Sequence, residues 1–299
     1  MRQAKKEYGA LGEGYIMKNL TQQALSKGMR VVKCSRSQAS LELLEAGLVE
    51  IKSFAGFKTN LAYPRVVFIH MPANLDIDSI LDELALHLEP GDIVVDGSNS
   101  YWGDSIQRHE RLRQSSGIHF VDLGISGGVE GSLYGACFMV GGELEAVAIV
   151  EPILKELAIP GGYLHAGQSG AGHFTKLVHN GIECGMLHAI AEGIDLLEHY
   201  QEQLNIAEIL RCWCHGSEIR SFLLDLLEEA YDVQKERPEI PASNEDTSKV
   251  RPLINDAIKM EVSVPVISQA IMQQFALHNE KKYWVRAITI MLRELGDYP

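Results

Sequence analysis

The sequence predicts an α/β fold in which a mostly parallel, doubly wound sheet is followed by an all-helical C-terminal domain. In the first half of the 299 residues, short β-rich runs alternate with amphipathic helical segments, which is typical of a parallel sheet with helices on both faces. After Gly167, helical periodicity dominates to the C-terminus. We therefore expect an α/β domain over residues 1–166 and a helical domain over residues 167–299.

The elements of the first domain are expected in regular order. Each strand is short and is followed by glycine, proline or small polar residues, which favour turns. The expected strands are Met29–Val32, Val66–Met71, Ile93–Val95, His119–Leu123, Cys137–Val140 and Tyr163–His165. The expected helices are Asn19–Ser26, Leu41–Ala46, Ile77–His87, Asp104–Gln114 and Glu145–Leu157.

The second domain is expected to contain only helices. Their periodicity covers roughly 171–200, 206–232, 252–260, 264–279 and 283–296. The polar stretch Gln234–Lys249 contains two prolines and is interpreted as a loop. The first of these helices lies at the domain junction, where ligand clefts are favoured.

Charge and composition exclude several function classes. The formal net charge is −13, so no basic excess exists to neutralise a nucleic acid or an anionic membrane. An anionic small molecule needs only a few local cations. No apolar run is long enough to span a membrane, and the five cysteines lack the pattern of a disulfide framework. We expect a cytoplasmic protein.

The most informative segment is a polar stripe on the helix after Gly167. Lys176, His179, Asn180 and Glu183 fall at i, i+3, i+4 and i+7, which places them on one helical face. An exposed helix could carry these residues harmlessly. The remaining faces are apolar, as expected of a buried helix, so we expect the stripe to line an active-site cavity. The apolar residues are Phe174, Leu177, Val178, Ile182, Met186 and Leu187.

A glycine pattern near the N-terminus indicates dinucleotide binding. A Rossmann fold carries Gly-x-Gly-x-x-Gly between its first strand and helix, for a tight turn, pyrophosphate approach and close packing. Gly12 and Gly14 supply two glycines, and Met17 replaces the third. Lys5–Glu7 place charges where a buried strand needs aliphatic residues. An ordinary turn could also carry Gly-x-Gly.

Methionine at the third glycine position predicts weak cofactor binding. The Met17 side chain must push the first helix away or point out of the contact. Either outcome would shift the helix N-terminus that faces the pyrophosphate. On this reasoning, Met17→Gly tightens cofactor binding without changing substrate affinity.

The end of the second strand predicts which cofactor is bound. NAD sites place an acidic residue there to hold the ribose hydroxyls, and none is present in the sequence at this position. Ser35, Arg36 and Ser37 instead offer hydroxyls and a guanidinium, which suit the 2′-phosphate of NADP. A solvated loop is the alternative, so NAD stays possible.

Two further segments follow strand ends, where doubly wound sheets bind ligands. Asn99 is placed to contact substrate and cofactor, or else forms an Asx turn. Met71, Pro72 and Ala73 could wall the nicotinamide pocket. These four residues are therefore binding candidates.

A glycine-rich turn and a cysteine pair complete the candidates. Ser126, Gly127 and Gly128 offer a hydroxyl and N–H groups that suit a carboxylate, although a bare glycine turn is the alternative. Cys212 and Cys214 point to different helix faces, with no second ligand pair at zinc spacing. We expect buried thiols there and no metal site.

Taken together, these segments resemble the 6-phosphogluconate dehydrogenase family, in its short bacterial form. The resemblance is strongest over Asp96–Ser100, Asp122–Gly142, Pro160–Gly193 and Trp213–Asp225. The run from Ile159 to Glu183 separates this family from its hydroxyisobutyrate dehydrogenase relatives. The resemblance implies oxidative decarboxylation of 6-phosphogluconate in the pentose phosphate pathway, with NADP and without metal, by a homodimer or homotetramer.

The resemblance also implies roles for matching residues. Lys176 matches the general base that acts on the 3-hydroxyl, and Glu183 matches the acid that protonates C1 of the enediol. The implied substrate-binding set is His179, Asn180, Asn99, Ser126, Gly127 and Gly128.

Three departures from the family pattern leave alternatives open. Met17 and Ser98 replace glycines, and Cys184 replaces a tyrosine whose hydroxyl meets the substrate phosphate. Arg251 and Arg286 are the candidates that would bind this phosphate instead. The alternatives are a related β-hydroxyacid dehydrogenase with a shifted substrate and a catalytically impaired relative with a damaged cofactor site.

Overall fold

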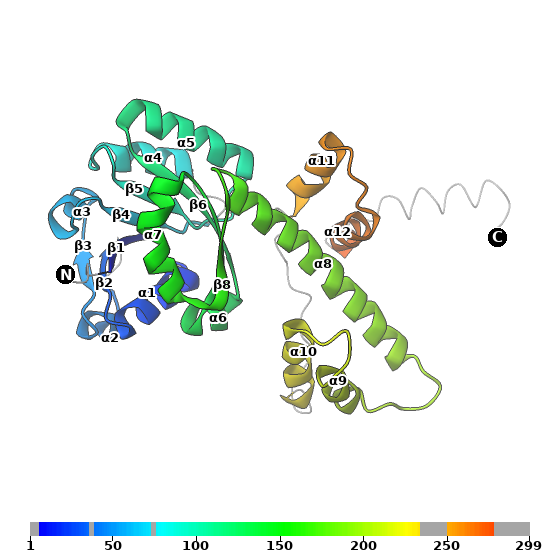
Figure 1. The fold of residues 1–299 in the computed structure, drawn as a ribbon. Helices are drawn as coiled ribbons and strands as arrows, with labels where there is room; N and C mark the ends of the chain where they lie inside the picture. The colour runs from blue at the N-terminus through cyan, green and yellow to red at the C-terminus, as the bar shows by residue number, and fades with distance from the viewer. Residues whose placement is uncertain (1–5, 36–38, 73–75, 234–249, 278–299) are drawn as a thin grey trace, which may run out of the picture. The chain divides into compact units, whose positions relative to one another are not determined.

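The chain forms two compact units, residues 1–178 and 179–299. The computed structural model describes residues 6–35, 39–72, 76–233 and 250–277 (Figure 1). The division between the units falls inside the long helix α8, Ala171–Glu198. No helix in these ranges is long and apolar enough to cross a membrane.

One eight-stranded sheet organises the first unit. Its strand order is β3-β2-β1-β4-β5-β6-β7-β8, and every pair of neighbours is parallel except β6 and β7. The chain runs outward in both directions from β1, which is the doubly wound Rossmann arrangement, so the predicted fold class is confirmed. The strands are β1 (Glu7–Leu11), β2 (Arg30–Cys34), β3 (Val49–Ile51), β4 (Val66–Ile69), β5 (Ile93–Asp96), β6 (His119–Ser126), β7 (Ala136–Gly141) and β8 (Ala158–Gly167).

Helices cover both faces of the sheet and bury a separate apolar core on each. Successive strand residues alternate between the two cores, so Val31 and Val121 face α1 and α7 while Val32 and Phe120 face α3, α4 and α5. Figure 1 shows α4 and α5 across the sheet from α1. The helices of this unit are α1 (Tyr15–Ser26), α2 (Leu41–Glu45), α3 (Ala55–Asn60), α4 (Ile77–Ala85), α5 (Trp102–Ser116), α6 (Gly128–Tyr134) and α7 (Leu144–Leu157).

The expectation of a charged first strand is wrong. Strand β1 begins at Glu7, and the four residues that follow it, Tyr8–Leu11, are all buried. Glu7 lies at the rim of the sheet, where its carboxylate pairs with Arg30 at 3.2 Å. The core positions of β1 are therefore apolar, as a central parallel strand requires.

The hydrophobic periodicity of the sequence missed three short elements and one break between two helices. Strand β3 and helices α3 and α6 are too short to show a clear repeat. The expected helix over 206–232 is two helices, because the chain turns at Gly216, whose φ is +79°. The expected helix over 283–296 lies outside the described residues.

The second unit is helical over its described residues. Its helices besides α8 are α9 (Ile206–Cys214), α10 (Phe222–Val233), α11 (Arg251–Lys259) and α12 (Pro265–Leu277). Two expectations for it are wrong. Cys212 is exposed rather than buried. Helix α8 is not buried along all of its apolar surface, because the side chains of Ile182, Met186 and Leu187 are exposed.

Met17 lies inside the core rather than outside the contact. Its side chain is 2% exposed and borders a small internal cavity of about 10 Å³ whose other walls include Tyr8, Phe68 and Leu123. Helix α1 still begins directly after Gly14. Methionine is therefore accommodated in the core by the flexibility of its side chain, next to this small cavity.

Replacing Met17 by glycine should destabilise the fold. The change removes a buried side chain and adds glycine to a helix, so we expect a loss of about 3–5 kcal/mol in the free energy of unfolding. Chemical denaturation would measure it. A denaturation midpoint equal to that of the wild type would show that Met17 contributes nothing to the core, and any gain in cofactor affinity must be compared on folded protein.

Candidate active site

The loop after β1 has the geometry of a dinucleotide-binding turn. Gly12 has a φ of +139°, and a Cβ there would collide with the carbonyl oxygen of His70. Only glycine fits this position. Gly14 then caps α1 without a side chain, so the first N–H groups of the helix are left for an anionic group. The predicted role of Gly12 and Gly14 fits this geometry.

Glu13, which contacts Ser35 at the end of β2, is a side chain that the sequence analysis missed. Ser35 is 6% exposed, and its hydroxyl donates to the carboxylate of Glu13 at 3.3 Å. Glu13 lies between the two loop glycines, and an acidic residue at that position was the available signal. Arg36 and Ser37 lie outside the described residues.

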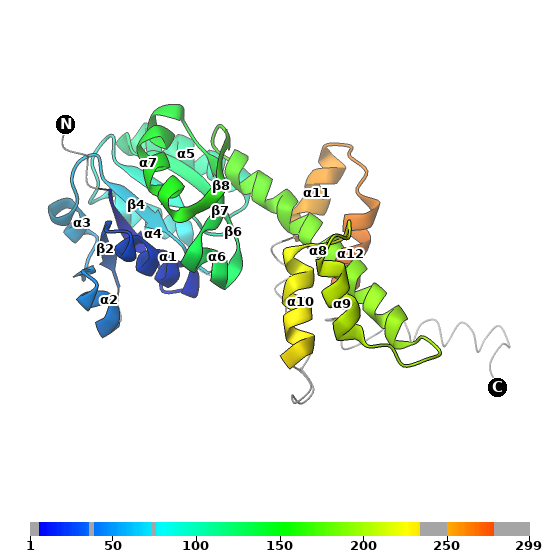
Figure 2. The ribbon, with the colours of Figure 1, turned by 60° about the horizontal axis from the view of Figure 1, so that its bottom comes forward.

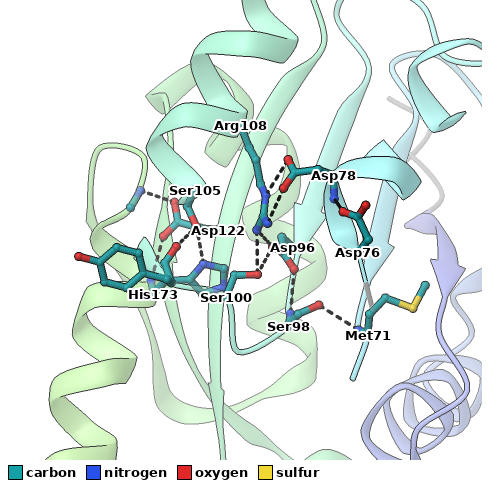
Figure 3. Close-up of polar contacts among 12 residues, drawn as sticks. Met71, Asp76, Asp78, Asp96, Ser98, Ser100, Ser105, Arg108, Asp122 and His173 are labelled. Atoms are coloured by element: carbon teal, nitrogen blue, oxygen red, sulfur yellow. Dashed lines mark hydrogen bonds and ion pairs between the residues drawn. The ribbon is translucent and has the colours of Figure 1, made fainter. Parts of the chain in front are cut away.

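The ends of β4 and β5 are joined through Ser98. The backbone N–H of Met71 donates to the Ser98 hydroxyl at 2.9 Å, and the N–H of Ser98 donates to Asp96 at 2.9 Å. The hydroxyl at Ser98, where the family pattern has glycine, thus holds two strand ends together (Figure 3). Pro72 follows Met71 directly, and Ala73 lies outside the described residues.

A buried carboxylate fixes the loop that carries Asn99. Asp96 is fully buried and accepts a hydrogen bond from Ser100 at 2.7 Å. The Arg108 guanidinium donates to Ser100 at 3.1 Å and forms a two-point ion pair with Asp78 (Figure 3), which lowers the pKa of the Asp78 carboxyl. Asn99 itself is exposed, so the loop is fixed while its amide stays accessible.

The glycine turn after β6 leads directly into a short helix. Gly127 and Gly128 have φ of +122° and +60°, and α6 begins at Gly128. Ser126 and Gly127 are half-buried and Gly128 is exposed. Helix α6 packs beside α1 (Figure 2), where the amide of Asn19 donates to the Ser132 hydroxyl at 3.0 Å.

The start of α8 is fixed to the sheet by Asp122. This fully buried carboxylate on β6 accepts from the backbone N–H groups of Gly170 at 2.6 Å and His173 at 2.9 Å. The His173 ring in turn bonds Ser105 at 2.7 Å (Figure 3). Sequence reasoning missed Asp122, although a carboxylate inside a predicted buried strand was the available signal.

The next turn of α8 places Lys176 against the sheet. A Cβ on Gly124 would lie 2.6 Å from the Cβ of Lys176, so the absence of a side chain on β6 allows the helix to approach. Lys176 is 9% exposed. The predicted base therefore has a buried stem whose position is set by β6.

The rest of the polar stripe lies further along α8, in the second unit. The His179 ring is 3.6 Å from the Glu183 carboxylate and 3.4 Å from the Asn180 amide oxygen. The side chains of His179 and Glu183 are 38% and 42% exposed. These three residues thus form a connected, accessible polar group.

The two arginine candidates for phosphate binding are not tested by the structure. Arg251 is exposed at the start of α11, with its guanidinium 5.4 Å from the ring centre of Phe275. Arg286 lies outside the described residues.

Comparison with known proteins identifies the family. The family model described as the NAD binding domain of 6-phosphogluconate dehydrogenase matches residues 7–167. YqeC of Bacillus subtilis, provisionally named as a 6-phosphogluconate dehydrogenase, is 33% identical over 294 residues, which are 97% of each chain. This chain belongs to the 6-phosphogluconate dehydrogenase family.

A further relative matches this chain over nearly its whole length, and two solved structures share its fold. The NAD(+)-dependent, decarboxylating 6-phosphogluconate dehydrogenase of Haloferax volcanii is 31% identical over 284 residues, covering 93% of this chain and 92% of the relative. The structure of the Plasmodium falciparum 6-phosphogluconate dehydrogenase has a TM-score of 0.80 at 23% identity, over 95% of this chain and 64% of that one. A 3-hydroxyisobutyrate dehydrogenase of Salmonella typhimurium has a TM-score of 0.73 at 17% identity, over 92% and 95%.

Membership of the 6-phosphogluconate dehydrogenase family makes the chain an oxidoreductase with a nicotinamide-dinucleotide-binding domain. The glycine turn at Gly12 and the free N-terminus of α1 fit that cofactor. At the level of the family, the resemblance found in the sequence is confirmed.

Proposed function

We propose that this chain oxidises and decarboxylates 6-phosphogluconate to ribulose 5-phosphate and CO2, with reduction of NADP. The observation that carries the proposal is the polar stripe of α8, which begins at Lys176, a buried lysine seated against Gly124. The stripe continues with His179, Asn180 and Glu183 on the same helical face. A base and an acid two helical turns apart on one face suit a reaction in which protons move at neighbouring carbons.

Two residues of α8 are assigned the proton transfers. The Lys176 amine takes the proton of the substrate 3-hydroxyl as C3 is oxidised, and a bound dinucleotide would supply the nicotinamide as the hydride acceptor. The product ketone lies β to the carboxylate. The carboxylate therefore leaves as CO2 when Lys176 returns its proton to the developing enolate oxygen. Glu183 then protonates the carbon that carried the carboxylate while Lys176 takes the proton back from the neighbouring enediol hydroxyl, and the enediol becomes the ketose.

The remaining candidates are assigned to substrate binding. Asn99 is an exposed amide on a loop fixed by Asp96, and we assign to it contacts with both substrate and cofactor. Ser126, Gly127 and Gly128 supply a hydroxyl and backbone N–H groups for the carboxylate. Arg251 and Arg286 are proposed for the phosphate.

Exposed apolar side chains support the predicted homo-oligomer. Ile182, Met186 and Leu187 of α8 are 51%, 40% and 39% exposed. Large apolar surface of this kind favours association between copies. A homodimer or homotetramer stays the prediction, which sedimentation of the full chain would test.

Steady-state kinetics test the proposed reaction. The purified protein is assayed with 6-phosphogluconate and either NADP or NAD, following nicotinamide reduction and CO2 release together. Equal rates of both products support oxidative decarboxylation. Nicotinamide reduction without CO2 would contradict the decarboxylating part of the proposal.

A related β-hydroxyacid dehydrogenase with another substrate is the second candidate, because of Cys184. The Cys184 thiol is buried in an apolar cluster with Val250 and Ile271 and bonds the Gln274 amide oxygen at 3.6 Å. It therefore does not replace the phosphate contact of a tyrosine hydroxyl. Turnover of 3-hydroxy acids without a phosphate, and not of 6-phosphogluconate, would favour this candidate.

Replacing Arg36 by alanine should weaken NADP binding far more than NAD binding. If Arg36 contacts the 2′-phosphate, it makes a charge-assisted hydrogen bond that contributes about 1.5–3 kcal/mol, so we expect at least a tenfold loss for NADP. Titration with each cofactor measures the two dissociation constants. Equal weakening of both would mean that Arg36 is a surface residue without a role in cofactor choice.

A further inference from the structure

The glycine pattern does not specify which residue stands at position 13, and in this chain that residue is Glu13. It is an exposed residue between Gly12 and Gly14, where the turn needs glycine only on either side. Its carboxylate nevertheless accepts a hydrogen bond from the buried Ser35 hydroxyl at 3.3 Å. The side chain therefore points toward the end of β2.

The sheet register explains why these two residues meet. Strands β1 and β2 are parallel neighbours, and Leu11 is paired with Cys34. Glu13 and Ser35 follow these two residues at the same carboxyl edge. In a doubly wound dinucleotide fold, the end of β2 is where the adenosine ribose lies, and an acidic side chain there holds the 2′-hydroxyl of NAD.

We propose that Glu13 contacts the 2′ position of the adenosine ribose and discriminates against a 2′-phosphate. The acidic group that is absent from the end of β2 is thus supplied from the β1–α1 loop. The inference rests on the proposed function only for the binding of a nicotinamide dinucleotide, and not for the sugar-acid substrate. It opposes the attraction predicted for Arg36, so the two residues together set the cofactor preference.

The hydrogen-bonding capacity of Ser35 also favours a 2′-hydroxyl over a 2′-phosphate. A serine hydroxyl has one proton, and Ser35 donates it to Glu13. The hydroxyl then has only lone pairs to offer, and so does the carboxylate. A ribose 2′-hydroxyl can donate to either oxygen, whereas the oxygens of a 2′-phosphate need donors and also carry like charge.

Replacing Glu13 by glutamine tests the proposal with a change of one charge and almost no change of shape. Isothermal titration of the full chain, without sugar acid, measures the dissociation constants for NADP and NAD. We expect NADP to bind about tenfold more tightly to the variant, because the variant no longer repels the 2′-phosphate. A change of about tenfold in affinity is typical of one pair of like charges at an exposed site. NAD should bind more weakly, because glutamine accepts a weaker hydrogen bond than a carboxylate.

Glu42→Gln is the matched control, because it removes the same charge from the exposed surface of the nearby α2. It should leave both dissociation constants unchanged. High salt should reduce the NADP gain of Glu13→Gln, since exposed charges are screened.

An equal change for both cofactors in Glu13→Gln, or an equal effect of Glu42→Gln, would overturn the proposal. Failure of the wild type to bind either dinucleotide would overturn it together with the proposed function. A shift in cofactor preference without turnover of 6-phosphogluconate would support the role of Glu13 and refute only the substrate.

Discussion

Replacing Lys176 by methionine should abolish oxidation of the sugar acid while the protein keeps its fold and its affinity for substrate. Methionine matches the buried stem of Lys176, which is 9% exposed, and lacks only the amine. A general base contributes ~10²–10⁴-fold to the rate, and we expect a loss in kcat of that order. Steady-state kinetics measure kcat, and calorimetric titration measures binding of 6-phosphogluconate.

The control for this prediction is Lys259→Met, which removes a lysine whose side chain is 72% exposed on α11. It should leave kcat unchanged. Near-normal turnover in Lys176→Met would remove Lys176 from the proposed mechanism. Loss of substrate affinity with unchanged kcat would instead make it a binding residue.

Replacing Gly172 by alanine should displace α8 from the sheet. A Cβ at Gly172 would lie 2.5 Å from the Met139 carbonyl oxygen, 2.6 Å from that of Asp122 and 2.7 Å from the Gly141 nitrogen. These are backbone atoms, which cannot rotate away. We expect a loss of about 3 kcal/mol in the free energy of unfolding, at the upper end for overpacking, and a fall in kcat because Lys176 lies one turn further along the helix.

The same helix offers the matched control at Gly193, where a Cβ would meet no atom within 4 Å. Gly193→Ala should stabilise the protein by up to about 1 kcal/mol, since alanine favours helix. Thermal unfolding and kcat are measured for both variants. Similar stability changes in the two would show that helix propensity, and not contact with the sheet, determines the effect at Gly172.

The fold class was predictable because short apolar strands that alternate with amphipathic helices leave a regular signal along the chain. Strands β4, β5 and β6 and helix α7 lie close to their predicted ranges. The first strand was misjudged because its start was placed too early in the sequence. Moving the strand by two residues toward the C-terminus removes Lys5 and Lys6 from it and adds Ala10 and Leu11. Strand β3 has only three residues, which is too short for a pattern of period two to be recognised.

The candidate site was predictable where one element carries several polar residues, and not where separate elements meet. The stripe on α8 is visible from local spacing alone. The bond from Ser35 to Glu13 and the bonds from Gly170 and His173 to Asp122 join residues 22, 48 and 51 positions apart. No local pattern encodes such pairs, because they depend on the order in which the strands assemble.

The hydrogen bonds from the start of α8 to Asp122 affect where two related chains could recombine without loss of structure. The matched nucleotide-binding sequence ends at residue 167, but the compact unit continues to Val178. A recombination junction at 167 would pair a foreign helix start with a buried carboxylate and with the small surface of Gly124. A junction after Val178 would keep both contacts together with Lys176, so the segment that preserves the seat of the helix is longer than the sequence match.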